Sequence, residues 1–278
     1  MSRQSSTPGR DQFSVLMPVY HRDIPRQVRA AFESVTTYQT LAPAQIVIVR
    51  DGPVGLGLAE LLGELAGQPQ VDVVELGQNL GLAAALNAGL EACRFPVVAR
   101  QDADDLSFPN RFELTVPLVK GPVQVVGGAM REFTEVPAGT ACQPAAADPQ
   151  PQTLPAPRPG THRCWGPERT YPLTTAEIVR QAKLRNPMAH PTVVFNKNAV
   201  QRCGGYRPFH HLEDYDLWVR LLQAGAEAAN VPDVVVAYCA PTEAYGRRGG
   251  LKTLRAEWEL QRELLRTGFV SPAQRLRN

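Results

Sequence analysis

The sequence is poor in the features that mark membrane, nucleic-acid-binding and secreted proteins. No apolar run approaches the ~20 residues that a membrane-spanning helix needs. The formal net charge is only +2, so there is no overall basic field to attract nucleic acid, and we predict no nucleic-acid partner. Residues 1–11 are polar and lack the apolar segment of a secretory signal. We therefore predict a globular protein of the cytoplasm.

Cysteine is also scarce. The five cysteines are scattered, odd in number and without a Cys-x-x-Cys pair. Reduced thiols are the simplest interpretation, as expected in the cytoplasm. Cys142, His162 and Cys164 match no standard zinc spacing and lack a fourth ligand, so we predict no metal site there.

Apolar runs typical of strands alternate with helical patterns along the chain. Hydrophobic residues make up 44% of the 278 residues, enough for one large domain or two small ones. We expect strands at 13–19, 45–49, 71–76, 97–100, 123–129, 192–195 and 231–238, and helices at 24–37, 56–66, 82–93, 174–184, 214–224 and 253–267. Such alternation predicts an α/β fold with a mostly parallel, Rossmann-like open sheet and helices on both faces. In these sheets, ligands bind beyond the carboxyl ends of the strands.

Residues 136–172 differ from the rest of the chain. This segment is rich in proline and alanine and has almost no periodicity. We interpret it as a long mobile loop rather than packed structure. It is either a lid over the site or a surface insertion that the fold tolerates.

Three aspartates follow the predicted strand at 97–100, in the stretch "VVARQDADD". Two carboxylates ~4 Å apart repel each other by about 4 kcal/mol at an effective dielectric of ~20. Asp102, Asp104 and Asp105 therefore need a compensating group, which is Arg100, a helix N-terminus or a divalent cation. Aspartate oxygens without nearby His or Cys favour Mg²⁺ or Mn²⁺. A solvated turn that caps the next helix is the alternative.

The aspartate cluster resembles the Asp-x-Asp signature of inverting family 2 glycosyltransferases with the GT-A fold. Further landmarks of that family appear in the same order along 13–238: "VLMPVYHR", "IVIVRDGPV", "NLGLAAALNAGLEAC", "NPMAHPTVVFNKNAVQRCGGY" and "EDYDLW". The Asp-Gly-Pro-Val, Asn-Pro and His-Pro variants further resemble the subset that builds bacterial capsule, exopolysaccharide and O-antigen chains.

The resemblance implies a single GT-A domain over 13–245. Its nucleotide-sugar-binding half would cover 13–130, and a smaller acceptor-side, catalytic half would cover 173–245. Residues 1–12 would be a disordered tail, and 246–278 would form an amphipathic C-terminal helix.

The resemblance also implies the chemistry. A sugar would pass from a nucleotide-diphosphate donor to a hydroxyl of a saccharide or polyprenyl-linked saccharide. Asp51 would accept a hydrogen bond from a base N–H, which suits uracil or thymine, and a UDP-sugar is the favoured donor. Donor contacts would come from Pro18, Tyr20, Asp51, Asn79, Arg100, Asp102 and Asp104. Asp104, with Asp102 or Asp105, would hold Mn²⁺ or Mg²⁺ against the departing diphosphate. Asp214 would be the catalytic base, with His190 and Glu213 on the acceptor side.

The sequence departs from the family at several positions. Arg50-Asp51 stands where the family often has two aspartates, and Leu86 stands where many relatives carry a diphosphate-binding arginine. Phosphate binding would then fall to Arg100 or to the cation alone. The carboxylates at the start of the helix at 214–224 also have a simpler interpretation, since acidic side chains stabilise helix N-termini.

Two other functions remain to be weighed. A nucleotidyltransferase that makes nucleotide sugars shares this type of sheet but usually has a glycine-rich loop after the first strand, where this chain reads "PVYHRDIPR". A non-catalytic nucleotide- or carbohydrate-binding protein would not need both Asp104 and Asp214.

The C-terminal helix raises the question of membrane contact. Its basic residues and apolar residues such as Trp258 suit an anionic surface at the inner face of the membrane. Its glutamates dilute that charge, and ordinary packing of an amphipathic helix is the alternative interpretation.

Overall fold

The first half of the chain forms a parallel sheet, as its alternating pattern predicts. The structure is a computed structural model that describes residues 12–142, 154–209, 211–240 and 251–271. The predictions for 1–11 and for 143–153 fall outside the described residues. Strands pair in the order β3-β2-β1-β4, all parallel. These strands and their connecting helices are β1 (Ser14–Tyr20), α1 (Pro25–Val35), β2 (Gln45–Asp51), α2 (Leu56–Ala66), β3 (Val71–Leu76), α3 (Leu82–Ala92) and β4 (Val97–Arg100).

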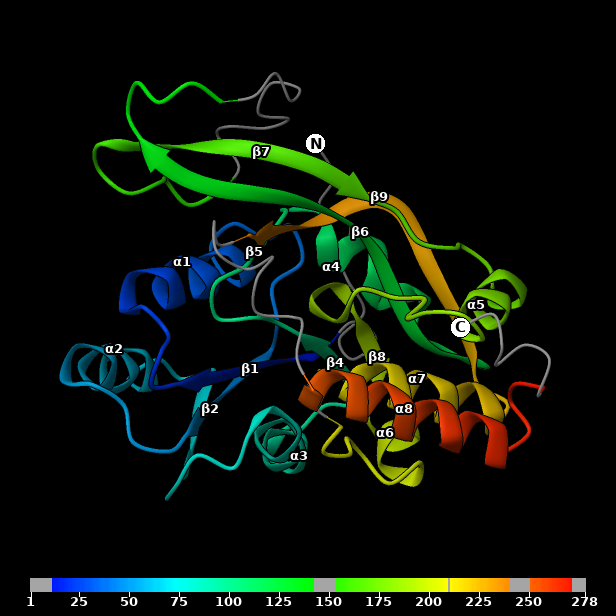
Figure 1. Ribbon diagram of the computed structural model, residues 1–278. Helices are drawn as coiled ribbons and strands as arrows, with labels where there is room; N and C mark the ends of the chain where they lie inside the picture. The colour runs from blue at the N-terminus through cyan, green and yellow to red at the C-terminus, as the bar shows by residue number, and fades with distance from the viewer. Residues whose placement is uncertain (1–11, 143–153, 210, 241–250, 272–278) are drawn as a thin grey trace, which may run out of the picture.

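The second half extends the same sheet with strands of both directions. β8 pairs antiparallel with β4 and with β6, whereas β9 pairs parallel with β6 and antiparallel with β5. In Figure 1, β6 and β9 run side by side and curve over the rest of the sheet. The remaining elements are β5 (Leu106–Ser107), α4 (Arg111–Thr115), η1 (Val116–Leu118), β6 (Val123–Pro137), β7 (Thr161–Arg169), α5 (Thr175–Ala182), η2 (His190–Thr192), β8 (Val194–Asn196), α6 (Lys197–Arg202), α7 (Glu213–Gln223), β9 (Glu227–Cys239) and α8 (Leu251–Arg266). The predicted α/β fold is therefore confirmed, and the sheet is mixed beyond β4.

The core lies on both faces of the sheet. On β1, the side chains of Val15 and Met17 pack with α1 and α2, while Leu16 packs with α3 on the opposite face. Gly89 lets α3 approach closely, since a Cβ at this position would lie 2.2 Å from Leu16 Cδ1. Trp218 of α7 is buried in the same layer as α3, as its place on the apolar helix face predicts.

The interpretation of 136–172 as a mobile loop is wrong where the segment forms strands, at 136–137 and 161–169. β6 continues to Pro137, and residues 161–169 form β7, which pairs antiparallel with it. Trp165 packs against Phe108 and Phe133, with ring centroids 6.2 and 5.9 Å away, and Leu154 is buried in the same cluster. This hairpin is held by a small number of aromatic residues and by partners that lie far away in the sequence. The segment therefore has no apolar periodicity from which the strands could be predicted.

The expectation of reduced thiols is wrong for one cysteine pair. Cys142 and Cys164 form a disulfide, with their Cα atoms 5.4 Å apart. Cys164 lies on β7 opposite Thr134 of β6, and Cys142 follows the end of β6. The disulfide therefore links β7 to the chain that leaves β6. Among the described residues, Cys93, Cys203 and Cys239 are free thiols.

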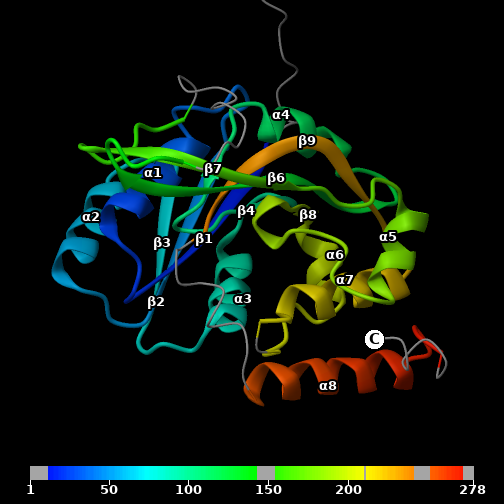
Figure 2. The same ribbon diagram turned by 45° about the horizontal axis from the view of Figure 1, so that its top comes forward.

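The C-terminal helix α8 packs on α7, which Figure 2 shows from the side. Leu260 and Leu264 are buried against Tyr215 and Val219. This packing uses the apolar face of the helix but leaves Trp258 53% exposed. No helix among the described residues is long and apolar enough to cross a membrane.

Candidate active site

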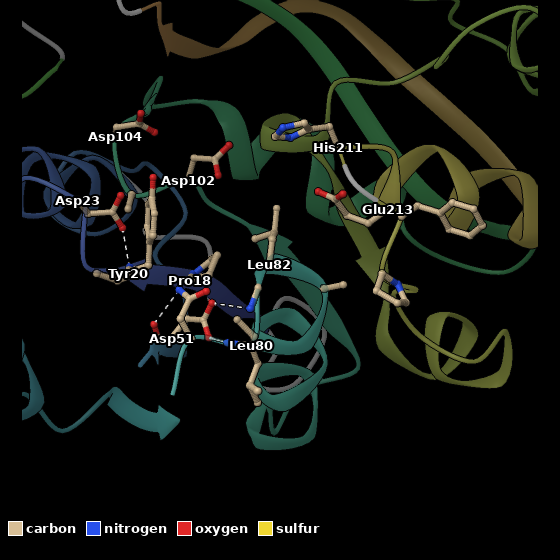
Figure 3. A pocket seen from close by; sticks show the side chains of 18 residues that line it. Pro18, Tyr20, Asp23, Asp51, Leu80, Leu82, Asp102, Asp104, His211 and Glu213 are labelled. Carbon is tan, nitrogen blue, oxygen red and sulfur yellow. Dashed lines mark hydrogen bonds between the residues drawn. The ribbon is translucent and has the colours of Figure 1, made fainter. Parts of the chain in front are cut away.

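A cavity of about 610 Å³ opens where the parallel strands end. Figure 3 shows its two walls, with Asp23, Asp102 and Asp104 on one side and His211 and Glu213 on the other. The predicted site residues that line it are Pro18, Tyr20, Asp51, Asn79, Asp102, Asp104 and Glu213. The predicted residues that are buried beside the cavity without lining it are Arg100, Asp105, His190 and Asp214.

Asp51 ends β2 and fixes the loop that leads into α3. Its Oδ1 accepts a hydrogen bond from the N–H of Leu80 at 2.7 Å, and its Oδ2 accepts one from Gly81 at 2.9 Å. The Asn79 side chain donates to the Asp51 carbonyl at 3.2 Å. Gly52 adopts a φ of +84°, and a Cβ there would lie 2.5 Å from the Asn79 nitrogen. The carboxylate thus organises the cavity wall, and each oxygen retains a lone pair for a ligand.

Asp23, Asp102 and Asp104 gather at the ends of β1 and β4 and make an acidic corner of the cavity. Asp23 Oδ2 accepts a hydrogen bond from the N–H of Tyr20 at 2.8 Å. Burial, with the charges of Asp104 and Asp102, raises the pKa of Asp23 to about 7. Asp104 is accessible from the cavity, but the surrounding protein and the Asp102 charge raise its pKa to about 6. The corner therefore holds more negative charge than its surroundings compensate.

Two buried arginines lie behind the acidic corner. Arg100 forms an ion pair with Asp102. Arg111 donates hydrogen bonds to the side chains of Gln101 and Ser107 at 2.8 and 2.7 Å, and burial next to Arg100 lowers its pKa to about 9. Of the three compensating groups that the sequence leaves open, Arg100 pairs with Asp102, but its burial keeps it from lining the cavity.

Asp105 belongs to the scaffold behind the cavity. Its side chain is fully buried, and Oδ1 accepts a hydrogen bond from the N–H of Cys239 at 2.8 Å, which ties the loop after β4 to the end of β9. Burial, together with the charges of Asp104 and Asp102, raises its pKa well above the usual range of an aspartate. The structure therefore places Asp102 and Asp104 at the cavity and Asp105 behind them.

Glu213 and Asp214 begin α7 on the opposite wall. Glu213 lines the cavity, and burial raises its pKa to about 7. Asp214 lies behind it, where Oδ2 accepts a hydrogen bond from Asn186 Nδ2 at 2.6 Å and Oδ1 accepts one from the N–H of Tyr215 at 2.7 Å. Burial raises the pKa of Asp214 to about 6, and these hydrogen bonds oppose that rise. Both carboxylates thus titrate near neutral pH, as general bases do.

His190 is held beneath the wall that the start of α7 forms. Its Nε2 lies 3.1 Å from the Tyr206 hydroxyl, and burial lowers its pKa well below the usual range, so the imidazole is neutral. The Asn87 side chain forms two hydrogen bonds with the backbone of Tyr206. Its Oδ1 accepts from the Tyr206 N–H at 2.9 Å, and its Nδ2 donates to the Tyr206 carbonyl at 2.8 Å. Gly205 adopts a φ of +65° beside Asn87. This arrangement gives His190 a supporting position, and its contact with an acceptor stays a prediction.

Several residues of the cavity escape prediction from the sequence. Asp23 lies three residues beyond β1, so the strand-end argument could have selected it, although the family motifs do not. Phe209 and His211 precede α7 in an irregular segment, where no periodic pattern marks them. Leu80 and Leu82 give the cavity an apolar floor at the start of α3.

The chain matches the family model "Glycosyl transferase family 2" over residues 14–172. It is similar to the amylovoran biosynthesis glycosyltransferase AmsE of Erwinia amylovora, with 34% identity over 265 residues, covering 93% of this chain and 88% of that protein. It is also 30% identical over 262 residues to an Escherichia coli UDP-Gal:alpha-D-GlcNAc-diphosphoundecaprenol beta-1,3-galactosyltransferase, covering 94% of this chain and 86% of that one.

Solved structures share the fold. A mannosyltransferase of Pyrobaculum calidifontis in complex with GDP-Man and Mn²⁺ matches 91% of this chain and 71% of its own, with a TM-score of 0.58 and 17% identity. The S. aureus TarS 1-349 structure matches 95% of this chain and 68% of its own, with a TM-score of 0.60 and 13% identity. At these identities the comparison supports the GT-A fold and no finer property.

Proposed function

The chain belongs to glycosyl transferase family 2, and on this basis we propose that it transfers a sugar from a nucleotide-diphosphate sugar to a hydroxyl group in cell-surface polysaccharide synthesis. The observation that carries the proposal is the cavity itself. It holds an acidic corner on one wall and a carboxylate at the start of α7 on the other. Family membership also argues against the nucleotidyltransferase and non-catalytic alternatives.

The donor would lie along the wall made by β1 and β2. Tyr20 is 39% exposed and offers an aromatic face to the base, while Asp51 retains lone pairs for a base N–H. The N–H of uracil or thymine can donate a hydrogen bond to the Asp51 carboxylate, and a UDP-sugar is the favoured sugar donor. The E. coli relative is named for UDP-Gal, whereas the P. calidifontis structure contains GDP-Man.

The acidic corner fits a hard divalent cation. Asp102 and Asp104 offer carboxylate oxygens at the cavity, and Asp23 places a third carboxyl group beside them. We expect Asp104 and Asp102 to hold Mn²⁺ or Mg²⁺. When bound, such a cation supplies Lewis-acid stabilisation of the departing diphosphate. Arg100 orients Asp102 through their ion pair.

The acceptor hydroxyl would approach from the wall formed by α7, opposite the leaving group, so the anomeric centre would invert. Asp214 is the proposed base, oriented by Asn186 and by the N–H of Tyr215. Glu213 is a second candidate for the base, because it lines the cavity while both oxygens of Asp214 are already engaged. An α-linked donor would then give a β-glycoside.

A lipid-linked acceptor at the inner face of the membrane would require peripheral contact from a cytoplasmic protein. The exposed Trp258, with Arg262 stacked 4.6 Å from its ring centroid, is the feature of α8 that favours such contact. Flotation with vesicles containing anionic lipid tests this proposal. Loss of vesicle binding on Trp258→Ala would support it, and no binding by the unaltered chain would end it.

A donor screen tests the proposed activity. The purified chain is incubated with UDP-, GDP- and dTDP-sugars in Mn²⁺, in Mg²⁺ and in chelator, and release of the nucleoside diphosphate is measured. We expect release from one donor class that requires the cation and falls about 10³-fold or more in Asp104→Ala. Asp233→Ala is the control, since Asp233 is exposed on β9 away from the cavity lining. Cation-independent release, or full activity of Asp104→Ala, would contradict the proposed role of the acidic corner.

A further inference from the structure

Three side chains of ligand type meet beside the β6–β7 hairpin, outside the lining of the cavity. Cys142 follows β6, and His162 and Cys164 belong to β7. The His162 Nε2 atom lies 3.3 Å from Cys142 Sγ and 3.8 Å from Cys164 Sγ. Cys142 is exposed and the other two are partly exposed, so solutes reach the group. The sequence spacing argues against a metal site, but the fold brings the three ligand atoms within 4.8 Å of one another.

Of the three distances between the ligand atoms, the two that join the His162 nitrogen to a sulfur match those of a tetrahedral zinc site. With Zn–S near 2.3 Å and Zn–N near 2.05 Å, a ligating nitrogen and sulfur lie about 3.5 Å apart, and two ligating sulfurs about 3.8 Å apart. Both nitrogen–sulfur separations in the structure already have that size. Only the two sulfurs are too close, because they are bonded to each other. Reduction of that bond removes the obstacle.

We propose that Cys142, His162 and Cys164 form a redox-controlled binding site for a zinc-like divalent cation, with a fourth position left to water. The reduced thiolates and the imidazole bind the cation, whereas oxidation replaces it with the disulfide. With a peroxide as oxidant, the two thiolates lose two electrons and form the S–S bond, the cation leaves, and the peroxide takes up two protons to give two water molecules. The metal and the disulfide are therefore alternative states of one site.

Either state fastens the chain beyond β6 to β7. The two cysteines are 22 positions apart in the sequence, so a bond or a shared metal between them links the chain after β6 directly to β7. The same hairpin carries Trp165, which packs in the cluster that contains Leu154. The site thus ties Cys142 to β7 in reducing and in oxidising conditions.

Cobalt binding to the full chain tests the metal-bound state. The protein is reduced anaerobically, freed of metal with a chelator and titrated with Co²⁺, whose thiolate charge-transfer band reports sulfur ligands. Cation bound to the carboxylates of the acidic corner gives no such band, so the two sites are distinguished. We expect the band to appear with one Co²⁺ per chain, to be displaced by Zn²⁺ and to vanish in Cys142→Ser and Cys164→Ser. His162→Ala should weaken binding at least about tenfold.

Cys203→Ser is the matched control, because Cys203 is a free thiol outside the cluster. It should keep the band unchanged. The metal site is overturned if the reduced chain shows no thiolate band, or if the band survives in Cys142→Ser. The redox link is tested by adding hydrogen peroxide to the loaded protein, which should abolish the band and remove two titratable thiols for each cation released. Oxidation that forms the disulfide while the band persists would overturn the exchange.

Discussion

The two walls of the cavity are built in different ways. The proposed donor wall consists of strand ends held side by side by the sheet, where Tyr20 and Asp51 are register partners on β1 and β2. The proposed acceptor wall consists of the start of α7 and the irregular chain before it. That chain depends on side chains that reach its backbone from elsewhere, notably Asn87 of α3 at Tyr206 and Arg220 of α7 at Gly205.

Because the two walls are held differently, substitutions in them should affect the reaction in different ways. A backbone ladder positions the strand ends of the proposed donor wall, so replacing Asp104, which is accessible from the cavity, should remove a ligand without moving its neighbours. On the acceptor wall, single side-chain hydrogen bonds position the backbone, each contributing about 0.5–1.5 kcal/mol. We therefore expect substitutions in that wall to alter acceptor use through displaced geometry.

Replacing the proposed base should have the largest effect. Asp214→Asn keeps the shape of the side chain but removes the group that takes the acceptor proton. We expect kcat to fall about 10²–10⁴-fold, while the KM for the donor stays within about twofold because the donor wall is unchanged. Steady-state kinetics of sugar transfer give both quantities.

Two further variants make the result decisive. Asp233→Asn, the same change at an exposed position of β9, should leave kcat unaltered. Glu213→Gln should lower kcat less than Asp214→Asn. If Asp214→Asn transfers sugar at the normal rate and Glu213→Gln does not, the base is Glu213, the carboxylate that lines the cavity.

A matched pair of glycine substitutions compares the two walls directly. Gly52 and Gly205 both adopt positive φ, and a Cβ at either would lie 2.5 Å from a neighbour: the Asn79 nitrogen in one case and Asn87 Oδ1 in the other. Each alanine should cost about 1–3 kcal/mol in local strain. We expect Gly52→Ala to raise the KM for the donor about five- to tenfold and Gly205→Ala to do the same for the acceptor.

Gly225→Ala controls for the cost of positive φ alone. Gly225 has a φ of +84°, and a Cβ at this position would meet no atom within 4 Å. The substitution should lower the melting temperature and leave both KM values unaltered. The contrast between the walls fails if Gly52→Ala and Gly205→Ala change the same KM.

The donor wall could be predicted from the sequence to a large extent, and the acceptor wall could not. Continuous apolar runs mark β1, β2 and β4, and parallel strands place their ends at one edge, so Asp51, Asp102 and Asp104 follow from the pattern. Asp105 shows the limit of that reasoning. Its adjacency to Asp104 says nothing of the direction of its side chain, which the hydrogen bond from Cys239 turns into the protein.

The acceptor wall depends on contacts between distant parts of the chain. Asn186 and Asp214 are 28 positions apart, and Asn87 and Tyr206 are 119 apart. No local propensity encodes such pairs. The β6–β7 hairpin could not be predicted from the sequence for the same reason. Its Trp165 packs against Phe108 and Phe133, which lie far from it along the chain.

The smallest expected effect concerns the influence of Asn186 on the pH dependence of kcat/KM. Its hydrogen bond favours the ionised form of Asp214, whose pKa burial raises to about 6. A base acts when deprotonated, so activity rises as pH increases through that pKa. Asn186→Ala should raise the pKa by about half a unit to one unit. We expect kcat/KM to fall about two- to fivefold at pH 6 and to recover above about pH 8.

The other charged groups facing Asp214 are Arg100 and Glu213, and both remain in this variant. Glu213 titrates in the same range, so the profile is repeated in Glu213→Gln, where the shift caused by Asn186→Ala should persist. Asn196→Ala is the control, because Asn196 caps α6 through the N–H of Ala199. Loss of that cap costs about 1 kcal/mol of stability but should not move the profile. A pH-independent loss in Asn186→Ala would show that Asn186 only supports the fold, and the acceptor wall would then lack the tuned base that distinguishes it from the donor wall.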